Sequence, residues 1–170
     1  MRGGLAPRAR RCMFQSAPGR EAGRCDHLHK QIRAALVTAL TGLTTSGARV
    51  YANRLYPMDS ANLPGLRIFL DGEEAEILTV HGPAVYDRRL ALSVECCASA
   101  VSGLDDTLDL MSKEVEIALA SGITVAGRNL PLTYAGMAFE DLPGDKPAGV
   151  KRLTFSLPFA AAASAPDTLV

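Results

Sequence analysis

The sequence predicts one α+β domain, in which a mainly antiparallel sheet carries two helices packed on one face. Residues 88–98 alternate apolar and polar side chains, as a half-buried strand does. Residues 104–119 repeat apolar side chains three and four positions apart, which is helical spacing. The order of the segments is helix, strands, helix, strands, and this order predicts a mainly antiparallel sheet with two helices on one face.

The first expected element is a helix over residues 27–42, with Asp26 as its N-cap. Its leucine, isoleucine and alanine residues recur at helical spacing and form one apolar stripe. A short strand is expected over 49–55. The turn Leu63-Pro64-Gly65 then leads into a strand over 66–70, and the pair Asp71-Gly72 is expected to end that strand.

The stretch from Gly72 to Asp87 mixes acidic, apolar and loop-forming residues. It carries Glu73, Glu74 and Glu76 at its start and a Gly-Pro pair further on. A segment of this composition predicts a long hairpin excursion or a mobile loop that the core does not require.

The strand over residues 88–98 has a clear inward and outward face. The inward positions are Leu90, Leu92, Val94 and Cys96. The outward positions are Arg89, Ala91, Ser93 and Glu95. A strand with this alternation is expected to bury one face and to expose the other to solvent.

The helix over 104–119 has the strongest local signals in the sequence. Ser102 and Asp105 stand at the spacing of a capping box, with Asp in place of the usual Glu. Asp105 and Asp106 lie at the positive end of the helix dipole, which favours acidic side chains. Gly122 is a plausible C-cap residue, so we expect the helix to end shortly before it.

The last third predicts two more strands and two irregular segments. The strands are expected over 132–139 and 151–159, with the Pro- and Gly-rich linker 141–149 exposed between them. The small residues of 161–170 predict a flexible C-terminal tail. The domain itself is expected to span 26–160.

Residues 1–25 are expected to form a disordered, Arg-rich N-terminal arm. The first 26 residues hold six arginines against two acids, so the remaining chain is mildly acidic, with 12 basic and 16 acidic residues. An acidic body argues against nucleic acid as the main partner. The arm is either a basic nucleic-acid-binding segment or a product of translation from a start upstream of the natural one. No run of 18 apolar residues indicates a membrane span, and the cytosol is the default compartment.

No motif in the sequence indicates catalysis, a cofactor or a metal. The segment Gly122–Asn129 has the outer glycines of a phosphate loop but lacks its Lys and Ser/Thr, and it is better explained as a hairpin. Cys96 and Cys97 are neighbours on a strand, so their side chains point to opposite faces and are expected to be apolar filler. The cluster at Cys25–His29 crosses a loop–helix junction, where its ligands diverge. We therefore expect no enzyme activity and no cofactor.

The ordered set of segments resembles the tail terminator family of long-tailed phages, the minor tail protein U type. The resemblance covers about residues 28–159 and rests on patterns of residue type. The segments that carry it are the N-terminal helix, Asn53-Arg54-Leu55-Tyr56-Pro57, the strand Leu63–Leu70, the acids Glu73, Glu74 and Glu76, the strand Arg89–Glu95, the helix Leu104–Leu119 and the strand Arg152–Phe159.

This resemblance implies a structural virion protein with an α+β fold. Members form a ring, usually of six subunits, that caps the tail tube, stops its polymerisation and offers a surface to the head-side neck or connector protein. The expected partners are therefore copies of the same chain, the tail tube protein and the neck protein. No membrane is involved, and nucleic acid passes only through the ring lumen. The expected location is the tail–neck junction of the virion, after assembly in the host cytoplasm.

Six residues are candidates for subunit or tube contacts under this resemblance. Arg67, Glu95 and Arg152 are expected to face outward from the sheet, and Glu73, Glu74 and Glu76 lie in the stretch expected to touch the tube. Two alternatives stay open. One is a neck or head–tail connector completion protein, and the other is a ferredoxin-like module that binds a small ligand.

Overall fold

The computed structural model describes residues 26–53, 58–79, 81–142 and 148–170. The expected N-terminal arm, the end of the expected strand over 49–55 and most of the linker 141–149 lie outside the described residues. The elements, in chain order, are α1 (Leu28–Leu40), β1 (Val50–Ala52), the 3₁₀ turn η1 (Ser60–Asn62), β2 (Gly65–Ile77), β3 (Val85–Ser99), α2 (Leu104–Leu119), β4 (Ile123–Val125), β5 (Arg128–Leu130), β6 (Thr133–Leu142), β7 (Ala148–Ala162) and β8 (Ala165–Leu169).

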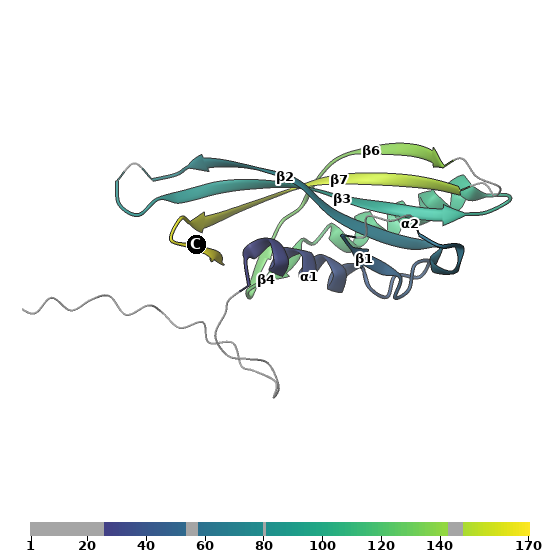
Figure 1. The fold of residues 1–170 in the computed structure, drawn as a ribbon, viewed down its shortest axis with the longest axis horizontal. Helices are drawn as coiled ribbons and strands as arrows, with labels where there is room; N and C mark the ends of the chain where they lie inside the picture. Colours follow the sequence, from purple (N-terminus) through teal and green to yellow (C-terminus); the bar gives the residue numbers. More distant parts are fainter. Residues whose placement is uncertain (1–25, 54–57, 80, 143–147) are drawn as a thin grey trace, which may run out of the picture.

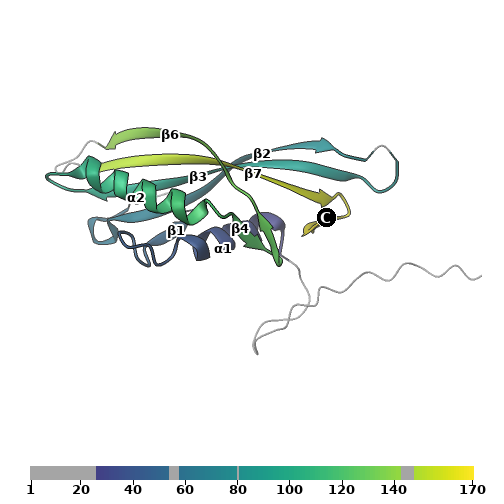
Figure 2. The same cartoon turned by 180° about the vertical axis from the view of Figure 1, so that it is seen from behind.

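The predicted α+β fold with a mainly antiparallel sheet is confirmed. The strand order is β1-β2-β3-β7-β6, and β8 pairs with the end of β7. Among the described strands of this sheet, only β1 runs parallel to its neighbour, which is β2. Both helices lie on one side of the strongly twisted sheet (Figure 1), and the view from behind places α2 in front of the strands (Figure 2).

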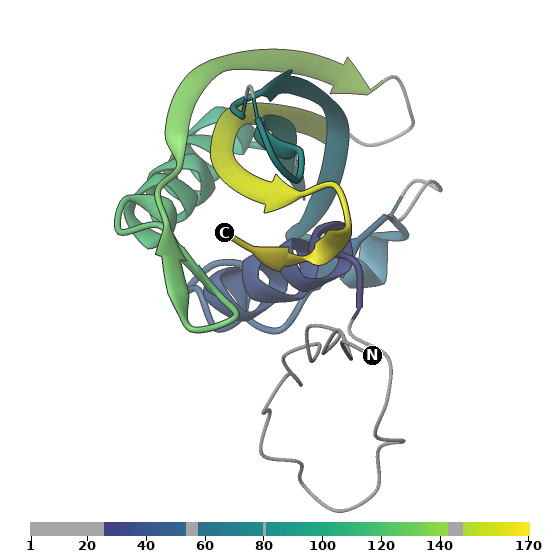
Figure 3. The ribbon, with the colours of Figure 1, turned by 90° about the vertical axis from the view of Figure 1, so that its left-hand side faces the viewer.

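The core lies between the helices and the sheet. The apolar stripe of α1 is completely buried and consists of Leu28, Ile32, Leu36 and Leu40. The matching stripe of α2 is Leu108, Met111, Val115 and Leu119. Seen end-on, the sheet curves around these helices (Figure 3). The helical spacing read from the sequence therefore identified the buried side of each helix, and α2 has the expected bounds.

The stretch Gly72–Asp87 is a long hairpin. β2 pairs with β3 from Gly65 opposite Cys97 to Ile77 opposite Tyr86, so only residues 78–84 connect the strands. The hairpin alternative was right and the mobile loop was wrong. Asp71-Gly72 does not end the strand, because a β-bulge between Leu70 and Gly72 absorbs one extra residue and the ladder continues. The hairpin projects beyond the helices (Figure 1).

The C-terminal segment belongs to the sheet, and the expectation of an unanchored tail was wrong. β7 continues to Ala162, and β8 turns back to pair with it at Ala161 opposite Leu169. Leu169 is buried, and the amide nitrogen of the Gln31 side chain on α1 donates a hydrogen bond of 2.9 Å to the Asp167 carbonyl. The small residues of 161–170 show no apolar periodicity, so the sequence did not predict a strand there. The pairing of backbone groups between β7 and β8 does not depend on such a periodicity.

Both helices begin differently from the sequence expectation. His27 caps α1, and its Nδ1 accepts a hydrogen bond of 3.2 Å from the backbone N–H of His29. Asp26 instead pairs with Lys30 one turn along. The residue before α2 is Gly103, in a left-handed conformation with φ of 68°, and Ser102 makes no cap. The N-cap position has a left-handed backbone, which favours glycine over serine.

The connection from α2 to β6 contains a separate small hairpin. β4 and β5 pair from Ile123 opposite Leu130 to Val125 opposite Arg128. This confirms the hairpin interpretation of a segment with the outer glycines of a phosphate loop. At Gly122, φ is +82° and an added Cβ would lie 2.4 Å from the Leu130 carbonyl oxygen, so only glycine fits there.

Candidate interaction surfaces

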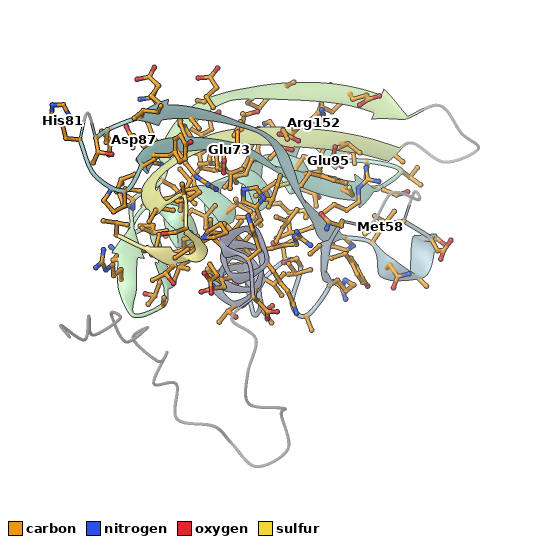
Figure 4. The ribbon with its side chains drawn as sticks, turned by 60° about the vertical axis from the view of Figure 1, so that its left-hand side comes forward. Met58, Glu73, His81, Asp87, Glu95 and Arg152 are labelled. Atoms are coloured by element: carbon orange, nitrogen blue, oxygen red, sulfur yellow. The ribbon has the colours of Figure 1, made fainter. Side chains whose placement is uncertain are left out.

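Arg67, Glu95 and Arg152 form one row across the sheet face that points away from the helices. Arg67 lies opposite Glu95 in the β2–β3 ladder, and Glu95 lies opposite Arg152 in the β3–β7 ladder. Glu95 points to the outer face, as expected, but it is only 2% exposed and has little surface to offer another subunit. Figure 4 shows Glu95 and Arg152 close together on this side of the sheet.

The two arginines hold Glu95 in different ways. Arg152 donates to Glu95 Oε1 from both Nη2 and Nε, at 2.5 and 3.0 Å. Arg67 Nη2 lies 2.6 Å from Glu95 Oε2, but off the direction of a hydrogen bond, so this contact is an ion pair. The hydrogen bonds that Arg152 donates to Glu95 are the main reason that the pKa of Arg152 is raised. The row therefore ties three strands together, and only half-exposed Arg152 offers charge to a partner.

Ser93 is the second residue of β3 that was expected to face solvent. It is completely buried, and its hydroxyl donates a hydrogen bond of 3.1 Å to Asp71 Oδ1 at the β2 bulge. β3 is the centre of the sheet, where side chains from both neighbouring strands cover the outer face. Residues 92–98 are consequently buried on both faces.

Glu73 does not face the exterior with the other acids of the hairpin. Its Oε2 lies 2.7 Å from His29 Nε2 on α1, and its Oε1 lies 3.4 Å from Arg88 Nη1 on β3. Its side chain is 19% exposed. The bulge at Asp71 changes which residues of β2 face the helices, and this change brings Glu73 to the helix side. Sequence reasoning missed both partners because nothing in the sequence marked the bulge.

Glu74 and Glu76 are exposed on the other face of the hairpin, as expected for contact residues. Glu76 lies directly opposite the exposed residue Asp87 in the ladder. Like charges placed opposite each other are unfavourable for a sheet by themselves. Within the described ranges neither Glu76 nor Asp87 forms an ion pair. Figure 4 shows Asp87 and His81 on the projecting part and Glu73 nearer the body.

A second surface, between α2 and the edge strand β6, was not predicted from the sequence. It holds an open cavity of about 220 Å³, lined by Asp105, Leu108, Asp109, Met137, Phe139 and Lys151. Met137 and Phe139 are each 51% exposed although their neighbours Leu153 and Lys151 on β7 face the core side. Lys151 forms an ion pair with Asp109 across this surface. We call this surface the α2–β6 groove.

The described residues contain no cluster of three or more metal-binding side chains. Within the same part of the chain, no helix is both long enough and apolar enough to cross a membrane.

Comparison with known proteins gives a remote structural likeness. No protein-family model and no curated protein matches the sequence. A solved chain described as "Virion of native gene transfer agent (GTA) particle" is similar at a TM-score of 0.45 and 18% identity, over 79% of this chain and 92% of that chain. A likeness at this level carries no argument about function.

Proposed function

We propose that this chain is a structural virion protein, the terminator of a phage tail. In this proposal it forms a closed ring, of six copies by the family resemblance, that caps the tail tube, ends its growth and presents a surface to the head-side neck protein. The observation that carries the proposal is the projecting hairpin of β2 and β3, which the helix layer does not cover. Such an extension is suited to reaching a neighbouring component.

The far part of the hairpin is the proposed contact with the tube. Glu76 and Asp87 stand opposite each other there, with no cation of the described chain paired to either. A basic side chain on a partner would relieve this like-charge pair, which the fold alone leaves unfavourable. Ile77 and Leu78, which follow, are largely exposed and supply apolar contact area. Glu73 is excluded from the contact because it is already held by α1 and β3.

The test exchanges the acidic pair for a basic pair. Glu76→Lys with Asp87→Lys keeps two like charges opposite each other, so the fold is expected to be retained. A matched control, Asp106→Lys with Glu116→Lys, makes the same change in net charge on exposed positions of α2. The ring mass of each variant is measured first, because loss of capping by an intact ring differs from loss of the ring.

Electron microscopy of tails made with each variant gives the answer. The hairpin variant is expected to give tails of uncontrolled length that fail to join heads, and the control is expected to give normal tails. Normal tails from the hairpin variant would remove the hairpin from the mechanism. A protein found on virions that leaves tail length unchanged when it is deleted, but prevents head joining, would indicate a connector completion protein. A protein never found on virions would overturn the proposal.

A further inference from the structure

We infer that the ring closes by edge-to-edge strand pairing, with β6 of one copy added antiparallel to the free edge of β2 in the next copy. This inference rests on the proposed function, because it names the surface by which copies of the chain join. The partner is a second copy of the same chain, and the contact is heterologous, as a closed cyclic ring requires.

The two edges are of matching length and lie on opposite sides of the sheet. β6 is the last strand on one side and runs for ten residues, from Thr133 to Leu142. On the other side β1 pairs only with Leu66–Ile68 of β2. Among the described residues, no strand pairs with the outer edge of β2 from Phe69 to Ile77. Unpaired edges of this length are rows of free backbone donors and acceptors that favour strand addition.

The strand directions fit this contact. β2 is antiparallel to β3, β3 to β7, and β7 to β6, so β6 and β2 run in opposite directions in one copy. Rotation about a ring axis preserves these directions. β6 of one copy therefore meets β2 of the next as an antiparallel neighbour, and the ladder pattern continues from copy to copy.

The two edges are staggered along the strands, and the stagger is compatible with a closed ring. In the register of β7, β6 covers positions 148–156, whereas the free part of β2 covers 154–161. The centres differ by about 18 Å at ~3.3 Å per residue, and one copy of four strands is about 19 Å wide at ~4.8 Å per strand. A ring of such copies needs strands tilted by about 45°, at the upper end of the ~35–45° found in closed barrels.

The side chains at the β6 edge also favour a covering strand. Met137 and Phe139 are half-exposed on the helix side, beside the α2–β6 groove. On the outer side Ala138 is small, and the next residue across the sheet is half-exposed Arg152. An acidic residue on an added strand would come within reach of this arginine. β2 supplies such a residue, since Glu74 lies on the same outer face.

Disulfide trapping tests the inference through the alternation of faces. The experiment uses a variant in which Cys12→Ser and Cys25→Ser remove two of the four native cysteines. The other two, Cys96 and Cys97, are buried. Ala138→Cys is combined in turn with Gly72→Cys, Glu74→Cys or Glu76→Cys, which share its outer face. The control combines Ala138→Cys with Ala75→Cys, which lies one residue away on the helix side. Mild oxidation is followed by electrophoresis without reductant.

The expected result is a ladder of covalent oligomers with at least one outer-face partner and none with Ala75→Cys. A ring that forms by mass measurement but cross-links with none of the three outer-face partners overturns the inference and leaves the proposed function standing. Equal cross-linking through Ala75→Cys overturns it as well. A chain that forms no ring at any concentration overturns both proposals.

A second pair of variants tests the edge without cysteines. Met137→Lys places a charge in the contact, whereas Leu110→Lys changes an equally exposed leucine (49%) on α2. Met137→Lys is expected to raise the concentration at which half the chains are assembled by roughly tenfold or more, a loss of at least about 1.4 kcal/mol. Leu110→Lys is expected to leave it unchanged. Circular dichroism checks that both variants are folded. A larger effect of Leu110→Lys than of Met137→Lys on the assembly concentration contradicts the inference.

Discussion

Replacing Glu95 by glutamine is expected to destabilise the fold strongly, although glutamine has almost the same shape. The substitution removes the negative charge between Arg67 and Arg152. Removing one partner of a buried ion pair costs about 3–5 kcal/mol, because the remaining charge stays buried and uncompensated. Here the Arg67 side chain is 15% exposed, whereas Arg152 is half-exposed and can return to water.

Only one of the two arginines therefore contributes the full penalty, and a loss near the lower limit, about 3 kcal/mol, is expected. For a chain of this size about 1 kcal/mol corresponds to a shift of roughly 2–4 °C, so the melting temperature should fall by about 6–12 °C. Arg152→Met removes both hydrogen bonds of the buried Glu95 carboxylate but leaves its ion pair with Arg67, so it should cost less than Glu95→Gln, about 1–3 kcal/mol.

Urea unfolding followed by circular dichroism measures both variants, at protein concentrations below assembly because association stabilises the folded chain. The expected signature for Glu95→Gln is a lower midpoint with an unchanged slope. A double-mutant cycle of Glu95→Gln with Arg67→Met isolates the buried part of the row. The reasoning is refuted if Glu95→Gln lies within about 1 kcal/mol of the parent, the range of an exposed ion pair.

Three further predictions follow from the core and the C-terminus. Leu108→Ala should cost about 2–5 kcal/mol in the same unfolding experiment, because this leucine is fully buried between α2 and the sheet; an unchanged midpoint would mean that α2 does not pack as described. Truncation after Ala163 removes β8 and the buried Leu169, and should lower stability by at least ~1.5 kcal/mol, whereas a dispensable tail would leave the midpoint unchanged. Burial raises the pKa of Cys96 from 9.0 to about 12 and that of Cys97 to about 11, so in the chain with the other two cysteines replaced, iodoacetamide at pH 8 should react only after unfolding. Since the folded pKa values lie above the unfolded value, stability should be unaffected below pH 9 and should fall as pH rises from about 9 to 12; labelling of the native chain, or a flat profile, would contradict the burial.

The sequence was most informative where one local rule decides the structure. The spacing of apolar residues located α2 from Leu104 to Leu119, and alternation located the side of β3 that faces the helices. Both patterns arise from contact with a single apolar layer, so they can be read from a window of a few residues. The fold class followed from the order of such windows along the chain.

The candidate site could be predicted only in part, because it depends on neighbours in space. The outward position of Glu95 follows from alternation, but its burial depends on arginines from β2 and β7 that lie far away in sequence. Glu73 faces the helices because of one extra residue at Asp71, and a bulge has no reliable local signature. The α2–β6 groove is formed where a helix and an edge strand meet, so no single segment could reveal it.

The projecting hairpin of β2 and β3 is supported by a third strand along its length. A two-stranded ribbon is marginal in water, but β7 accompanies this one as a third strand until Ala162 lies opposite Val85. At the root, Glu73 clamps β2 to the first turn of α1 through His29. The far end of the hairpin is therefore joined to the helix layer through three paired strands and through the contact between Glu73 and His29.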